Sequence, residues 1–67
     1  MFHKKKTPIE LYKEQLQEDI RKTKLALDTA YSNFDNALDP EVIDCCIYEL
    51  NATQKRYVLL LKQMEHL

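Results

Sequence analysis

Two helix-starting motifs constrain this chain more than any other feature of its sequence. The first is Thr7-Pro8-Ile9-Glu10 and the second is Asp39-Pro40-Glu41. Thr7 and Asp39 each offer a side-chain oxygen to the free amide groups of a first helical turn. Proline follows at the first helical position, where its missing N–H is not needed, and Glu10 completes a capping box with Thr7. Because the chain has no Gly and no other Pro, these motifs predict two long helices.

The predicted fold class is all-α, an antiparallel two-helix hairpin over residues 7–67 that follows a basic, flexible tail of residues 1–6. We expect helix one at about residues 8–36 and helix two at about residues 40–66. Matched helices of roughly 40 Å joined by a short connection pack antiparallel. A chain of 67 residues buries only about 60% of its unfolded surface. We therefore expect two hairpins to pair into a four-helix bundle.

Apolar residues recur every three or four positions in both segments, which is typical of one buried helix face. Polar residues interrupt this pattern at Thr23 and Gln54. A register with Phe34 opposite Ile43 would bring Thr23 opposite Gln54, where either the two side chains share a hydrogen bond or both point partly to solvent. The predicted core positions are Ile9, Tyr12, Leu16, Ile20, Leu27, Ala30 and Phe34 in helix one, and Ile43, Cys46, Ile47, Leu50, Tyr57, Leu60, Leu61 and Met64 in helix two.

A second apolar line runs along helix two through Cys45, Tyr48, Ala52 and Leu59. These residues cluster within about 60° of one another, roughly opposite the predicted core positions. One interpretation is an interface for a second copy of the chain or for another protein. The other is four separate exposed apolar residues, which are common in small proteins.

Nothing in the pattern of reactive groups predicts an enzyme. Glu10, Glu14 and Glu18 share a solvated helix side, where Glu18 can pair with Lys22. His3 and His66 are far from each other and from any nucleophile. The chain lacks a glycine-rich phosphate loop, a Cys-x-x-Cys pair and a zinc-type Cys/His spacing. We therefore expect no catalytic residues, no cofactor, no metal site and no small-molecule substrate.

The two adjacent cysteines are best explained by packing. Cys46 falls among the predicted core positions and Cys45 falls on the second apolar line. A redox role for Cys45 is the alternative, although the carboxylates of Asp44 and Glu49 oppose thiolate formation there.

The net charge of −1 conceals a basic N-terminus. Phe2 and the lysines Lys4, Lys5 and Lys6 could contact an anionic membrane surface or nucleic-acid phosphates. The alternative is a disordered, solubilising tail. The sequence predicts neither a signal peptide nor a transmembrane segment. With two thiols, we expect a cytoplasmic protein.

The stretch Leu38-Asp39-Pro40-Glu41-Val42-Ile43-Asp44, together with Ile47–Ala52 and Lys55-Arg56-Tyr57, resembles the YaaL-like family. The short basic start also resembles that family. These are small bacterial proteins from Gram-positive lineages that form a domain family of unknown function. The resemblance implies a bacterial, cytoplasmic protein and brings no functional residues with it.

A comparison with the small aspartyl-phosphate phosphatases of the sporulation phosphorelay largely fails. Of their Ser-Gln-Glu-Leu-Asp signature, this chain has only the Glu-Leu pair, as Glu49-Leu50. Asn51 occupies the position of the signature's final Asp. We therefore expect a non-enzymatic protein-binding or adaptor module. The alternative is a regulatory binder of nucleic acid or anionic membrane that uses the basic tail.

Overall fold

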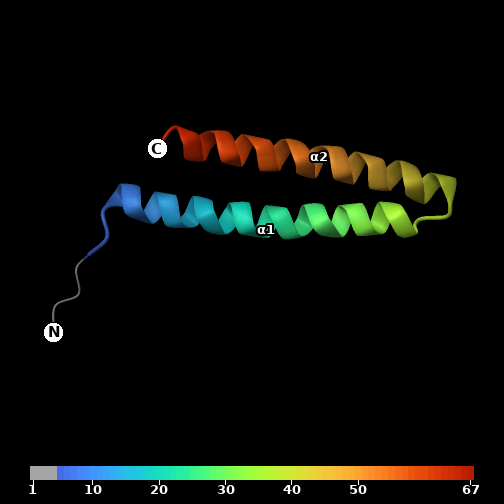
Figure 1. Cartoon of the computed structure of the whole chain (residues 1–67), viewed down its shortest axis with the longest axis horizontal. Helices are drawn as coiled ribbons and strands as arrows, with labels where there is room; N and C mark the ends of the chain where they lie inside the picture. Colours follow the sequence, from blue (N-terminus) through green and yellow to red (C-terminus); the bar gives the residue numbers. More distant parts are fainter. Residues whose placement is uncertain (1–4) are drawn as a thin grey trace.

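The structure, a computed structural model that describes residues 5–67, consists of two long helices. Helix α1 spans Pro8–Asn36 and helix α2 spans Pro40–Glu65. The two helices lie side by side and run antiparallel, with a short connection at one end (Figure 1). No strand occurs among residues 5–67. The predicted all-α helical hairpin is therefore confirmed.

Both predicted helix caps are formed. The Thr7 Oγ1 atom accepts a hydrogen bond from the Glu10 amide at 3.1 Å, and the Asp39 Oδ1 atom accepts one from the Glu41 amide at 2.8 Å. Thr7 and Asp39 both have extended backbone conformations. At the end of α1, the Ala37 amide donates to the Phe34 carbonyl at 3.3 Å. Only residues 37–39 separate the two helices, so the caps set where the chain reverses direction.

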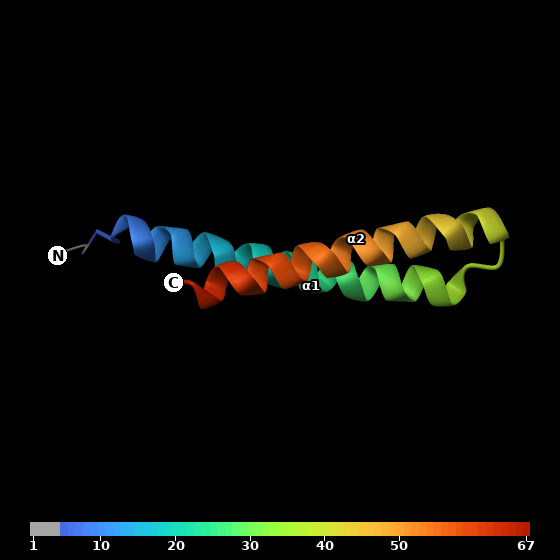
Figure 2. The ribbon, with the colours of Figure 1, turned by 90° about the horizontal axis from the view of Figure 1, so that it is seen from above.

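The helices are staggered along their common direction. The first turn of α2 projects beyond the end of α1, and the first turns of α1 project beyond the end of α2 (Figure 1). The perpendicular view shows the same overhangs and an oblique crossing of the helices (Figure 2). Near the starts of the two helices, Ile9 is 70% exposed, and Tyr12 and Val42 are half exposed. The predicted core positions at Ile9 and Tyr12 are therefore wrong, because no helix lies opposite the start of α1.

The core is a single seam between the two helices. Its α2 side alternates strictly between steps of three and four residues, as in coiled-coil packing. Three other predicted core residues are still exposed, Phe34 at 37%, Ile47 at 40% and Leu61 at 38%, and the last two lie beside the seam. The buried side chains are Leu16, Thr23, Leu27, Ala30 and Thr53, and the half-buried seam positions are Ile20, Ile43, Cys46, Leu50, Tyr57, Leu60 and Met64.

The predicted pairing of Thr23 with Gln54 is wrong. Thr23 is buried, but Gln54 is exposed, and its Nε2 atom donates a hydrogen bond to the Tyr31 Oη atom at 2.9 Å. The buried polar residue of α2 is the preceding one, Thr53, at 5% exposure. A shift by one residue turns a helix by about 100°. It therefore moves Gln54 out of the seam and onto its edge.

Removing the Asp39 cap tests the start of α2. Asp39→Ala should lower the free energy of unfolding by about 0.5–2 kcal/mol, because the Glu41 amide loses its acceptor. Thermal and urea melts would measure the effect. Asp35→Ala is the matched control, since it removes an exposed carboxylate near the end of α1 that caps no helix. Superimposable melts of the parent and Asp39→Ala would contradict the assignment of the cap.

A double-mutant cycle tests the contact between the helices. Tyr31→Phe and Gln54→Ala should couple by about 0.5–1 kcal/mol, because each removes one partner of the same hydrogen bond. The control cycle combines Gln54→Ala with Thr23→Val and should be additive. The opposite result, coupling between Thr23 and Gln54 with none between Tyr31 and Gln54, would contradict the structure. It would support the register in which Thr23 lies opposite Gln54.

Candidate protein-binding surface

The second apolar line of the sequence forms an exposed stripe on the outer side of α2. We call Cys45, Tyr48, Ala52 and Leu59 the outer stripe, and all four residues are exposed. Two steps along a helix amount to about 200°. Tyr48 is two residues from both Cys46 and Leu50, which are half buried in the seam. The Tyr48 side chain therefore points away from α1.

The outer stripe offers apolar area that the hairpin does not use. Tyr48 is 79% exposed, and Leu59 is more than half exposed. An exposed Tyr combines a large apolar ring with a hydroxyl group, which suits it to a protein interface. Self-association through the outer stripe stays a prediction. It would stack α2 on α2 of a second copy and leave both α1 helices outside the contact.

The basic tail is only partly within the described residues. Phe2 and Lys4 lie outside residues 5–67, whereas Lys5 and Lys6 are exposed and precede α1. The Lys6 ammonium group forms an ion pair with the carboxylate of Glu14. One of the lysines predicted to contact an anionic surface therefore already has an acidic partner within the chain.

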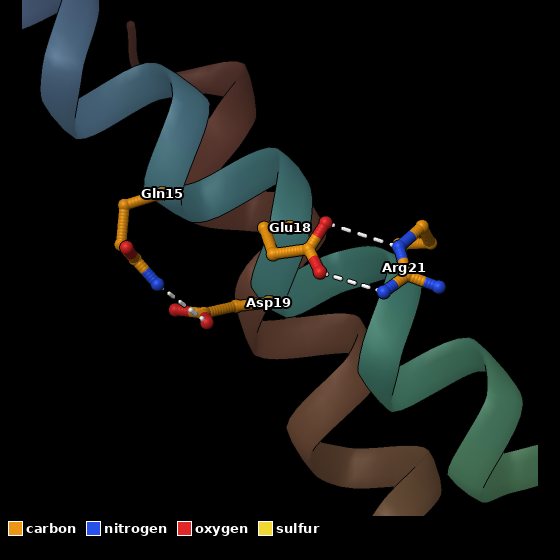
Figure 3. A network of polar contacts seen from close by, with 4 residues as sticks. All are labelled: Gln15, Glu18, Asp19 and Arg21. Atoms are coloured by element: carbon orange, nitrogen blue, oxygen red, sulfur yellow. Dashed lines mark hydrogen bonds and ion pairs between the residues drawn. The ribbon is translucent and has the colours of Figure 1, made fainter.

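Polar side chains on the first half of α1 pair along the helix surface (Figure 3). Arg21 donates two hydrogen bonds to the Glu18 carboxylate, at 3.0 Å from Nε and 2.6 Å from Nη2. These bonds, with the charges of Arg21 and Lys22, hold the pKa of Glu18 below its ordinary value. Gln15 donates to Asp19 at 3.1 Å. Arg21, rather than the predicted Lys22, is thus the direct partner of Glu18, and the arrangement is a solvated helix surface.

A second polar pair lies on α1 within two turns of Tyr31, which accepts the hydrogen bond from Gln54 of α2. The Lys24 ammonium group donates to Asp28 at 3.1 Å, and this bond raises the pKa of Lys24. The phenol groups of Tyr57 and Tyr31 add smaller effects on this pKa in the same direction. Sequence reasoning missed Tyr31. Its position four residues after the core residue Leu27 was the available signal.

The chemistry of the described residues is limited. Between residues 5 and 67, no group of three or more His, Cys, Asp or Glu residues could hold a metal ion, and no pocket is present. Cys45 and Cys46 are both free thiols. In the same part of the chain, neither helix combines the length and apolar character needed to cross a membrane.

The Glu18–Arg21 pair predicts a specific dependence of stability on pH. Because folding lowers the pKa of Glu18, its contribution is complete above the ordinary glutamate value of about 4.3 and is lost as the pH falls through the lowered pKa. Glu18→Gln should therefore be less stable than the parent at pH 7, and the difference should vanish in acid. Urea melts of both proteins, from pH 7 into acid, would measure the difference in their free energies of unfolding. Glu49→Gln, which removes an exposed carboxylate from α2, is the control. A difference that persists unchanged in strong acid would contradict the pair.

Comparison with known proteins identifies the family of the chain. Nothing matches the chain among the curated proteins or the solved structures. The sequence model of a protein family does match, over residues 1–66, which is almost the entire chain. The hairpin therefore belongs to the family described as "Protein of unknown function (DUF2508)".

Proposed function

We propose that this hairpin is a non-enzymatic protein-binding or adaptor module that binds another protein through the outer stripe. The observation that carries this proposal is the exposure of Tyr48, at 79%, among the other apolar residues of the stripe. Interfaces are enriched in Tyr, whose ring loses little conformational entropy when it is buried. The partner would offer an apolar groove for Tyr48 and Leu59, with a polar rim near the Tyr48 hydroxyl group.

The shape of α2 supports the same proposal. Cys45, Ala52 and Leu59 follow one another at intervals of seven residues, so they form a nearly straight line along the helix. Cys45 and Ala52 are small, whereas Tyr48 and Leu59 are large. A line of small and large apolar residues is a surface into which a helix of another protein can pack with its own ridges. Binding of this kind needs no pocket and no ionisable group.

The second candidate, a binder of nucleic acid or anionic membrane that uses Phe2 and the three lysines, has less support. Lys6 is paired with Glu14, and an ion pair within the chain competes with an external phosphate. The lysines that remain would each contribute only about 1 kcal/mol near an anionic surface.

Two finer assignments belong to this proposal. We propose that, within its family of unknown function, the chain is one of the YaaL-like bacterial proteins, on the basis of residues 38–44 and 47–52. We also propose a cytoplasmic location, which the free thiols of Cys45 and Cys46 support.

A photocrosslinking amino acid at position 48 tests the proposed function. The full chain, expressed in cells with the crosslinker in place of Tyr48, should form one predominant covalent adduct with a different protein. A crosslinker at the exposed position Lys13, on the other helix, is the matched control and should give no such adduct. Ala52→Glu combined with the crosslinker should abolish the adduct, because it places a charge within the apolar line.

The same experiment separates the alternatives. A variant with Gln in place of all three lysines, Lys4, Lys5 and Lys6, should give the same adduct at position 48 if the outer stripe binds the partner. Loss of the adduct in that variant would favour the tail. An adduct with twice the mass of the chain would instead support self-association through the outer stripe. Equal labelling at positions 48 and 13 would contradict the proposal.

A further inference from the structure

The hairpin leaves more surface exposed than a folded chain of its mass normally does. It exposes 5851 Å², whereas a globular monomer of 8.0 kDa exposes about 4,450 Å². Residues 1–4 could account for at most about 800 Å² of the difference, even with the exposure of an unfolded segment. At least about 600 Å² then remains, which approaches the roughly 800 Å² that each partner buries in a standard interface.

The shape of the molecule explains this excess. Its extents are 58 × 27 × 12 Å, and its radius of gyration is 16.6 Å, compared with about 11 Å for a compact chain of this length. No side chain in the described residues falls below 2% exposure. A flat pair of helices has a thin seam and two broad sides. One of those sides carries apolar side chains that are between 38% and 47% exposed.

We call this side the flanking face and define it by Tyr31, Ile47, Gln54, Val58 and Leu61. Ile47, Gln54 and Leu61 are seven residues apart, and each directly follows a seam residue of α2. Val58 lies one turn beyond Gln54. The hydrogen bond from Gln54 to Tyr31 brings α1 into the same face. Each apolar member is between 38% and 47% exposed, so the apolar seam continues onto this face.

We propose that the flanking face binds the flanking face of a second copy of this chain, so that two hairpins form a four-helix bundle. Positions beside the seam lie about 100° around α2 from the seam residues. That is the direction in which a bundle places the second neighbour of each helix. The flanking face includes residues of both helices, whereas the outer stripe belongs to α2 alone. A second copy on the flanking face would therefore cover α1 and α2 together.

The polar groups of the flanking face suit burial in such a contact. Gln54 and Tyr31 already satisfy each other with a hydrogen bond of 2.9 Å. Lys24 and Asp28 pair with each other at the edge, so the rim carries no net charge there. The flanking face is therefore mostly apolar, and its polar groups are paired with one another, which is compatible with a protein interface. This inference does not depend on the outer stripe, which would stay free to bind a different protein.

A matched pair of variants tests the face. Sedimentation equilibrium of the full chain should give twice the 8.0 kDa of one chain at high micromolar concentration. Val58→Glu should shift the protein to monomer, because a two-fold axis doubles the introduced charge within the interface. Ala52→Glu introduces the same side chain on the same helix, at an exposed position of the outer stripe, and should leave the dimer intact. Both substitutions replace exposed residues with a good helix former, so the hairpin should still fold.

The opposite pattern, a dimer in Val58→Glu and a monomer in Ala52→Glu, would overturn the assignment. A parent protein that is monomeric at that concentration would overturn it too, and so would loss of the dimer in both variants.

Covalent trapping is a second, independent test of the same contact. In a Cys45→Ser, Cys46→Ala background, Gln54→Cys places a thiol in the middle of the flanking face, close to the two-fold axis of the proposed dimer, where a residue can meet its own copy. Oxidised glutathione should then convert most of the protein to a disulfide-linked dimer. Tyr48→Cys in the same background should stay monomeric on a non-reducing gel. Rapid linkage at position 48 and none at position 54 would overturn the proposal.

Discussion

Two helices packed against each other can bury only the side chains that face one another. In this hairpin the resulting seam contains the buried residues Leu16, Thr23, Leu27, Ala30 and Thr53, and two of those five are polar. The burial of apolar area is the dominant favourable term in folding, whereas every ordered residue costs conformational entropy. A long hairpin orders many residues for each side chain that it buries. Its stability therefore depends on the caps, on the few fully buried side chains and on any surface that covers the half-buried ones.

The helices and their boundaries were predictable because they depend on local interactions. Thr7 and Asp39 cap their helices through amides only two or three residues away, and proline acts at the next position. A chain with no glycine offers no alternative place to end a helix within either segment. These features need no knowledge of the other helix, so sequence reasoning located both helices and the connection.

The register was not predictable from the same information. Thr53 and Gln54 are adjacent polar residues, and either could interrupt an apolar line on α2. The strict alternation of three and four residues, from Leu50 to Thr53 to Tyr57, identifies Thr53 as the seam residue. The stagger of the helices also depends on the short connection and on packing along the whole seam. Ile9 therefore has the spacing of a core residue but no helix opposite it.

Some of the apolar residues outside the seam lie on two surfaces of different kinds. The outer stripe was visible in the sequence because its spacing differs from that of the seam. The flanking face was hidden, since Ile47 and Leu61 have nearly the same periodicity as the seam and were assigned to it. Two structural observations distinguish the flanking face from the core: the exposure of these side chains and the hydrogen bond from Gln54 to Tyr31. Exposure of this kind depends on tertiary structure, which an amphipathic pattern alone does not specify.

A thin seam also links folding to binding. Any partner that binds the folded hairpin and not the unfolded chain raises its stability in proportion to the logarithm of the partner's concentration. For a second copy on the flanking face, that concentration is the protein's own, so the melting temperature would rise with the amount of chain present. For a different protein on the outer stripe, the hairpin would be stabilised only where that protein occurs. Because the two surfaces are on different sides of α2, the two effects would add, and a self-associated hairpin would present two outer stripes to its partners.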